Sequence, residues 1–124
     1  MNTKDIYWLA GLLEGEGCFS LSGSKGGSAR ISLNMTDKDI VERAALLLGS
    51  DIKIVKRYPN RKQVYRVEIF SSRAIAWMMT LYSLMGVRRK ETIEKSISFW
   101  KNQRFKNKSG LGRKNPRTKK EGKL

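Results

Sequence analysis

Residues 9–17 of this 124-residue chain read LAGLLEGEG, an apolar run that contains glycines and ends in two acidic residues and a glycine. Glycine inside a helix costs about 1 kcal/mol relative to alanine, yet Gly11 and Gly15 stand four positions apart in an apolar run. Residues four apart share a helix face, so the two glycines predict a groove into which a second helix backbone can press. The alternative is an ordinary amphipathic core helix that a glycine cap ends, at Gly15 or Gly17.

Two acidic residues close the same stretch. Glu14 and Glu16 fall at the C-terminal end of the predicted helix, where the helix dipole disfavours negative charge. A cation bound nearby would remove this penalty. The placement of the two acids therefore favours a functional use over a contribution to stability.

The stretch resembles the signature motif of the LAGLIDADG homing endonucleases, with identity at its first four positions and its last. Leu13 replaces an isoleucine, Gly15 replaces an alanine, and glutamates replace both aspartates, so both acidic positions keep a carboxylate. In this family the acid before the last glycine binds the catalytic divalent metal, a role that carries over to Glu16, while Glu14 supports the turn. The resemblance implies a site-specific, metal-dependent DNA endonuclease of the kind found in mobile introns, with Mg²⁺ as cofactor and Mn²⁺ as a substitute.

The composition agrees with a nucleic-acid partner. The chain has 26 Lys and Arg against 11 Asp and Glu, a net charge of +15, which favours binding to backbone phosphates. It has no histidine and a single cysteine, Cys18, which excludes intrachain disulfides, zinc fingers and histidine-based nuclease mechanisms. No apolar run is long enough for a membrane span and no secretory signal is visible, so we expect a soluble intracellular protein in the compartment of the genome that carries its target.

The charge is uneven along the chain. Residues 101–124 hold 10 basic side chains and 1 acidic one, with scattered glycines and almost no apolar periodicity. We predict one endonuclease domain over residues 1–101 and a disordered basic tail over residues 102–124. The tail either makes nonspecific phosphate contacts or only adds solubility.

Hydrophobic periodicity predicts an α+β fold with the element order α-β-β-α-β-β-α-α. The two hairpins make one four-stranded antiparallel sheet, with helices packed on one face and the other face left open as a DNA-binding saddle. This is the order expected of a LAGLIDADG half-domain. A capping box at residues 36–39 is expected to open the second helix, and Gly49 is expected to end it. The helices are expected over residues 3–14, up to 48, 72–85 and 88–101, and the strands over residues 17–22, 29–35, 52–58 and 63–70.

Polar and basic side chains alternate with apolar ones along the predicted strands. Arg and Lys can donate to guanine, Asn can pair with adenine, and Glu can accept from cytosine, while the hairpin tips contact phosphates. The alternative is an ordinary solvated sheet face. On this basis Ile52 and Ile54 point inward, and the predicted DNA-binding residues are Ser20, Ser22, Lys25, Arg30, Ser32, Asn34, Lys53, Arg57, Arg61, Lys62, Arg66 and Glu68.

One motif supplies one acidic site, whereas cleavage of both DNA strands needs two. We therefore predict a two-fold homodimer whose first helices meet through Ala10, Gly11 and Gly15, which brings two copies of Glu16 together near the minor groove. The target is then near-palindromic. Hydrolysis of the phosphodiester would leave a 5′ phosphate.

Three further catalytic candidates come from the resemblance. The residue after the threonine that ends the second strand orders water near the metal in several relatives, and here it is Asp37, which equally suits the start of the second helix. A basic residue at the start of the last helical region often lies beside the scissile phosphate. Arg88 aligns best with that position and Lys90 is the reserve.

Several alternatives remain open at this point. The same fold can serve as a cleavage-inactive DNA-binding regulator or as a maturase that binds intron RNA. An unrelated carboxylate nuclease is suggested by the acid-x-Lys pair of Asp51 and Lys53. An inert basic structural protein would explain the charge, although not the two acids that end a glycine-rich helix.

Overall fold

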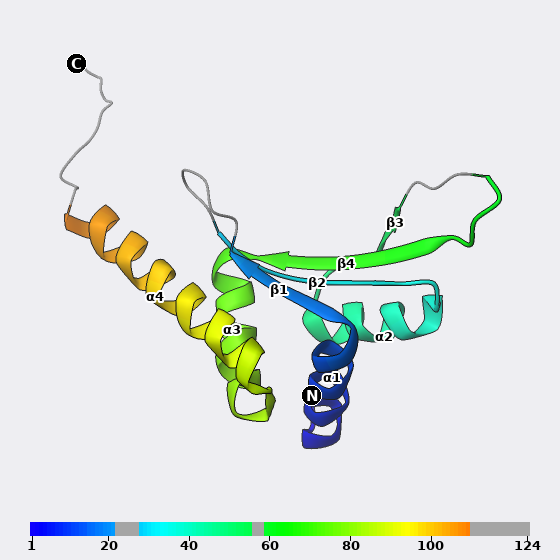
Figure 1. Cartoon of the computed structure of the whole chain (residues 1–124), viewed down its shortest axis with the longest axis horizontal. Helices are drawn as coiled ribbons and strands as arrows, with labels where there is room; N and C mark the ends of the chain where they lie inside the picture. The colour runs from blue at the N-terminus through cyan, green and yellow to red at the C-terminus, as the bar shows by residue number, and fades with distance from the viewer. Residues whose placement is uncertain (22–27, 56–58, 110–124) are drawn as a thin grey trace, which may run out of the picture.

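A computed structural model describes residues 1–21, 28–55 and 59–109, with side chains up to Gln103. The observed order confirms the predicted alternation of helices and strands, with one extra 3₁₀ turn before the last helix (Figure 1). The elements are α1 (Thr3–Glu16), β1 (Gly17–Leu21), β2 (Ala29–Met35), α2 (Lys38–Leu48), β3 (Lys53–Val55), β4 (Val64–Phe70), α3 (Ser71–Leu81), η1 (Tyr82–Leu84) and α4 (Val87–Ser109).

The four strands form one antiparallel sheet in the order β1-β2-β4-β3, with α1, α2 and α3 on one side of it (Figure 1). Because directly paired residues share a face, the register assigns the faces without ambiguity. Ile31 pairs with Phe19 on one side and with Ile69 on the other, and all three are buried against the helices. The opposite face carries the polar residues, as predicted.

The helices contribute fully buried side chains to this core, among them Leu9 and Leu13 of α1, Met78 of α3 and Ile93 of α4. Only the side chains of one α1 face reach the sheet, because helical residues three to four apart share a face. One face of the helix formed by the LAGLLEGEG stretch therefore belongs to the core. Gly11 and Gly15 lie on the opposite, exposed face.

Local signals set most of the helix ends. Asn2 rather than Thr3 caps α1: its side-chain oxygen accepts from the Asp5 backbone N–H at 2.9 Å, and the Asp5 carboxylate accepts from the Asn2 N–H. Gly49 ends α2 in the left-handed conformation at φ 73°, as predicted. The predicted capping box at residues 36–39 is wrong, because Asp37 is the N-cap of α2 and its side chain makes no cap hydrogen bond.

Three other expectations need correction. The helix predicted over residues 72–85 ends at Leu81, where the tighter turn η1 places the Tyr82 hydroxyl against Glu94 of α4. The third strand begins at Lys53, one residue later than predicted, and residues 56–58 of the predicted strand lie outside the described part of the chain. Ile54 does share the helix-side face with its partner Tyr65, but it lies on the edge strand and is 68% exposed, so its predicted burial is wrong.

The last helix is longer than predicted, since α4 continues past residue 101 to Ser109. Residues 102–109, placed in the predicted tail, are thus helical, and residues 110–124 lie outside the described part of the chain. No helix within the described residues is both long and apolar enough to span a membrane.

Candidate functional site

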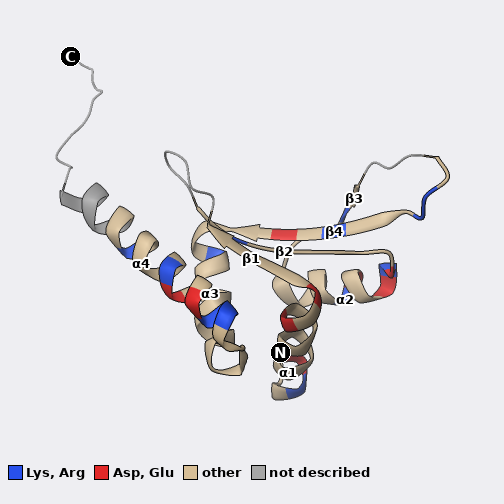
Figure 2. Ribbon diagram, viewed as in Figure 1, with Lys and Arg blue, Asp and Glu red and all other residues tan. Residues whose placement is uncertain are grey.

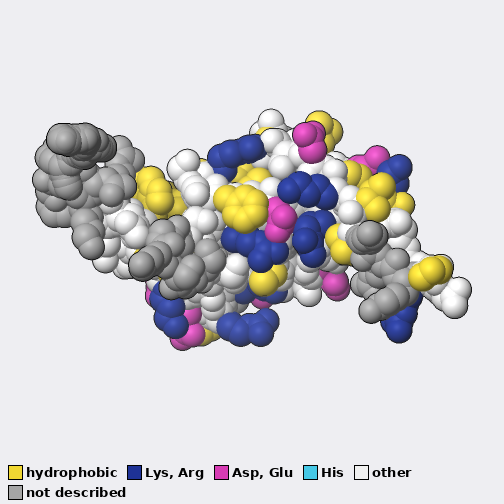
Figure 3. All heavy atoms as spheres, turned by 90° about the horizontal axis from the view of Figure 1, so that it is seen from above, with side chains coloured by type: hydrophobic (Ala, Val, Ile, Leu, Met, Phe, Trp, Pro, Cys, Tyr) yellow, Lys and Arg dark blue, Asp and Glu magenta, His cyan; other side chains and the backbone are white. Residues whose placement is uncertain are grey.

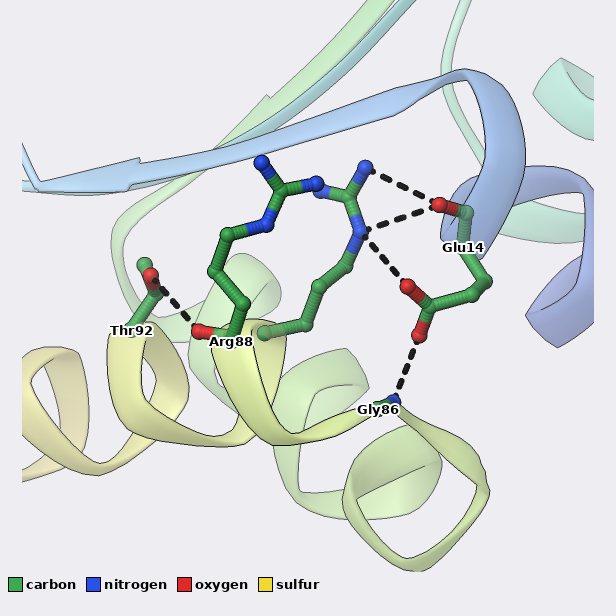
Figure 4. Close-up of polar contacts among 5 residues, drawn as sticks. Glu14, Gly86, Arg88 and Thr92 are labelled. Atoms are coloured by element: carbon green, nitrogen blue, oxygen red, sulfur yellow. Dashed lines mark hydrogen bonds and ion pairs between the residues drawn. The ribbon is translucent and has the colours of Figure 1, made fainter.

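The two acids that end α1 have different surroundings. The Glu14 side chain contacts Gly86, which directly precedes α4, and Arg89 of α4. The Gly86 N–H donates to Glu14 Oε1 at 2.6 Å, and Arg89 Nε lies 3.4 Å from Glu14 Oε2 (Figure 4). Arg89 also donates to the backbone oxygen of Glu14, from Nε at 3.2 Å and from Nη2 at 3.1 Å. Glu14 therefore fastens the end of α1 to the start of α4.

Arg89 compensates the charge at the end of α1. The helix has no basic residue in its own last turn, and the guanidinium from α4 supplies a cation where carbonyl groups concentrate negative charge. The Arg89 side chain is only 12% exposed and also lies 5.3 Å from the centre of the Phe19 ring. This contact positions the segment that follows, including Glu16 and Gly17.

Glu16 is the last residue of α1 and is exposed at the junction with β1, where Figure 2 shows acidic residues at the end of the helix. Its carboxylate makes no hydrogen bond or ion pair within the described part of the chain. Gly17 holds the junction tight, because a Cβ on it would lie 2.8 Å from the Leu13 carbonyl oxygen. Its φ of −79° is ordinary, so close contact and not backbone conformation requires glycine.

Glu16 is not part of a ready-made cation site. Within the described residues, no group of three or more Asp, Glu, Cys or His side chains could hold a metal ion. Asp37 is exposed at the start of α2, four residues beyond Leu33, the β2 residue that pairs with Gly17. Divalent cations take six or more oxygen ligands, so Glu16 by itself does not complete a cation site among the described residues.

The open face of the sheet collects most of the predicted DNA-binding residues. Ser20 pairs with Arg30, Ser32 pairs with Glu68, and both Asn34 and Lys53 pair with Arg66, so that all seven residues share this face. Seen from above, the face shows several Lys and Arg side chains around an acidic group (Figure 3). Arg61 and Lys62 are exposed between β3 and β4. The predicted residues that lie outside the described part of the chain are Ser22, Lys25 and Arg57.

Ser32 is an exception on this face. It is 2% exposed, and its neighbours on the same face are Glu68, directly opposite, and Arg30. A side chain covered to this extent offers almost no surface to a ligand, so the burial of Ser32 argues against its predicted contact with DNA. Cys18, by contrast, pairs with Ser32 on the same face and is exposed, although it is not among the predicted binding residues.

The outer side of α1 presents the two glycines. A Cβ added to Gly11 or Gly15 would have nothing within 4 Å, so both positions are open to the outside of the chain. Tyr7, one turn before Gly11, is 60% exposed. Ala10 does not belong to this strip, because it is 4% exposed and packs into the core of its own chain. This burial argues against the predicted place of Ala10 in a dimer contact.

Comparison with known proteins decides the family. Residues 3–80 match the family model described as the LAGLIDADG-like domain. The chain belongs to the LAGLIDADG family. No curated protein matches this sequence.

Solved LAGLIDADG structures share the fold. The group I intron-encoded homing endonuclease I-CeuI, complexed with DNA, superposes with a TM-score of 0.64 at 13% identity over 90% of this chain. The homing endonuclease I-TnaI gives 0.61 at 16% identity, covering 90% of this chain and 82% of its own. The archaeal intron-encoded homing endonuclease I-Vdi141I, also complexed with DNA, gives 0.55 at 20% identity, over 73% of this chain and 62% of its own. This chain spans 60% of the I-CeuI chain.

Within this LAGLIDADG fold, the basic run that opens α4 divides in a way that the sequence did not indicate. Arg89, the member of the run that the sequence did not favour, makes the contact with α1. Lys90 lies 5.4 Å from the centre of the Tyr82 ring. The Arg88 side chain is exposed, extends toward β1 in the view of Figure 4, and makes no hydrogen bond or ion pair within the described residues. Successive residues of a helix point in different directions, so only one of these three side chains can face the end of α1. That residue is Arg89.

Proposed function

We propose that this protein is a homing endonuclease that cuts both strands of a long, near-palindromic DNA site as a homodimer, with Glu16 as the metal-binding acid. The observation that carries the proposal is the contrast between the two acids of the family motif. The Glu14 carboxylate is engaged in contacts with Gly86 and Arg89, whereas Glu16 is exposed and unpaired among the described residues. A carboxylate left free at a helix C-terminus is electrostatically costly unless a cation joins it.

The sheet supports the DNA part of the proposal. Its open face is flanked by exposed basic residues at one hairpin, and the net charge of +15 favours association with phosphates. The α+β half-domain leaves such a face free because α1, α2 and α3 lie on the other side of the sheet (Figure 1). Double-stranded DNA is the partner whose groove accepts a twisted sheet of this kind.

The glycine strip supports the homodimer. Two copies of α1 can approach closely where Gly11 and Gly15 have no side chains. A two-fold axis between them places both copies of Glu16 near each other, because Glu16 follows Gly15 directly. Divalent cations would offset the mutual repulsion of the two carboxylates.

Divalent cations are part of the proposal. Glu16 of each copy would hold Mg²⁺, with Mn²⁺ as a substitute, together with phosphate oxygens. When bound, the ion polarises the scissile phosphate and activates the attacking water. In this proposal the exposed Arg88 guanidinium binds the phosphate and stabilises its developing charge, with Lys90 in reserve, and the exposed carboxylate of Asp37 orients water. Such an enzyme acts in the intracellular compartment that holds its target genome.

The decisive experiment is cleavage of a randomised duplex library with Mg²⁺, followed by sequencing of the cut ends. We expect Glu16→Gln to abolish cleavage while binding and circular dichroism stay unchanged, because the amide keeps the shape and loses the charge. The matched control is Asp51→Asn, which removes an exposed carboxylate elsewhere and should cut normally.

Other outcomes point to other functions. Normal cutting by Glu16→Gln together with loss in Asp51→Asn would transfer the chemistry to the Asp51 and Lys53 pair. No cutting by any form, with retained binding to a defined duplex or to an intron RNA, would replace the endonuclease by a regulator or a maturase.

A further inference from the structure

Two pairs of side chains on the open face of the sheet are already bonded to each other. Arg30 Nη2 lies 2.6 Å from Glu68 Oε2, and Arg66 Nε donates to Asn34 Oδ1 at 2.6 Å. Both pairs link β2 to β4, the two central strands. The Arg66–Asn34 pair spans directly opposed residues, and the Arg30–Glu68 pair runs diagonally, since Glu68 lies opposite Ser32.

These contacts change which side chains are free to read a base. The Glu68 side chain is only 11% exposed and its Oε2 already binds the arginine, so little of the carboxylate is open to a cytosine. Asn34 needs both its oxygen and its amide group to pair with adenine, and its oxygen is already occupied by Arg66. Neither residue is available for the base that its chemistry alone would select.

The two arginines, in contrast, keep donors in reserve. A guanidinium has five N–H donors. Arg66 uses Nε and retains both terminal nitrogens. Arg30 uses one N–H of Nη2, and its Nε is buried without a partner in the described part of the chain, so its free donors are also at the tip. Each pair fixes the plane of a guanidinium and leaves its outer end open.

We propose that Arg30 and Arg66 determine base specificity by binding guanine end-on, while Glu68 and Asn34 are positioning residues that hold the two guanidinium groups. This rests on the proposed DNA-binding function. Guanine presents two acceptors, N7 and O6, in the major groove, whereas adenine presents one acceptor and one donor, so a pair of parallel N–H donors prefers guanine. Fixing the arginine beforehand reduces the entropy lost on binding.

The register also predicts the spacing of the two guanines. Arg30 lies opposite Phe70 and Arg66 lies opposite Asn34, so the two backbone positions are four residues apart along the strands, about 13 Å. The Arg30 guanidinium reaches toward Glu68, which lies two residues closer, so the tips are roughly 7–13 Å apart. At about 3.4 Å per base pair this is about two to four steps. Each half-site should therefore contain two guanines at that separation.

The test is selection of bound duplexes from a randomised library by the Glu16→Gln protein without Mg²⁺, so that binding is separated from cleavage. We expect two enriched guanines two to four positions apart in each half-site. Asn34→Ala should reduce the preference at one of them by about tenfold, with little change in affinity for nonspecific DNA. Glu68→Gln should do the same at the other guanine, and Arg66→Lys should lose the preference although it keeps the charge.

The controls separate the inference from a general loss of binding. Glu42→Gln removes the same charge from an exposed position on α2, away from the sheet face, and should leave the preferences unchanged. Asn34→Ala removes a single exposed side chain, so it remains informative if Glu68→Gln fails to fold. Enrichment of adenine or cytosine that disappears in Asn34→Ala or Glu68→Gln, while Arg66→Lys reads normally, would overturn the inference and leave the DNA-binding function standing. No enrichment of any duplex would overturn both.

Discussion

Replacement of Arg89 by methionine tests the contact that holds the end of the LAGLIDADG helix. The variant keeps an apolar stem against Phe19 and removes the two hydrogen bonds to the Glu14 carbonyl and the ion pair with its carboxylate. The forked bond from a charged donor is worth about 1.5–3 kcal/mol, and the cation at the helix end adds about 0.5–1 kcal/mol. The Glu14 side chain is 39% exposed, so the ion pair itself contributes at most about 1 kcal/mol.

Together these contributions predict a loss of about 2–5 kcal/mol in the free energy of unfolding. For a domain of this size, this corresponds to a fall of about 10–20 °C in Tm. The assay is urea and thermal unfolding followed by circular dichroism, at one protein concentration because the proposed dimerisation would shift Tm. Arg88→Met is the matched control: the neighbouring side chain is exposed and makes no polar contact in the described residues, so its loss should change stability by less than about 0.5 kcal/mol.

A second pair of variants tests whether Glu14 is the partner that matters. Glu14→Gln alone should destabilise, and the double variant with Arg89→Met should lose less than the sum of the two single changes, because they break the same contact. If Arg89→Met and Arg88→Met unfold alike, Arg89 does not anchor α1, and the ordering of the segment that carries Glu16 needs another cause.

Two more predictions concern the outer face of α1 and the contact between η1 and α4. Gly15→Leu should convert the proposed dimer to folded monomers in light scattering, because a side chain at this position meets nothing within its own chain. The control Ala76→Leu, at an exposed position of α3, should stay dimeric. A dimeric Gly15→Leu would place the interface elsewhere. The hydrogen bond to Glu94, followed by desolvation and the Glu94 charge, raises the pKa of Tyr82 above its usual 10.0. The folded state therefore holds this proton more tightly, so the stability advantage of wild type over Tyr82→Phe should be full below pH 10 and shrink as the pH rises further, measured as urea midpoints at pH 8 and pH 11; a constant difference would show that the pair is not formed in solution.

Much of the fold follows from local sequence signals. The strand predicted over residues 29–35 has those bounds, Gly49 ends its helix, and the alternation along β2 and β4 places Arg30, Asn34 and Arg66 on one face. Each of these features depends on the chemistry of neighbouring residues and on periods of 2 or 3.6. Prediction failed at the start of α2, where two adjacent residues can serve as the N-cap and Asp37 takes this position instead of Thr36. It failed again at Tyr82, where a contact with Glu94 of α4 accompanies the early end of α3.

The sequence by itself therefore determined the family, the order of the elements, the polar face of the sheet and the presence of two acids at the end of a glycine-bearing helix. Only the tertiary structure decided which chemically equivalent candidate is free and which is engaged. Glu14 is held by residues 72 and 75 positions further along the chain, and Asn34 by one 32 positions away. Hydrogen bonds and ion pairs depend on distances of a few ångströms in space, and those distances exist only once the helices have packed on the sheet.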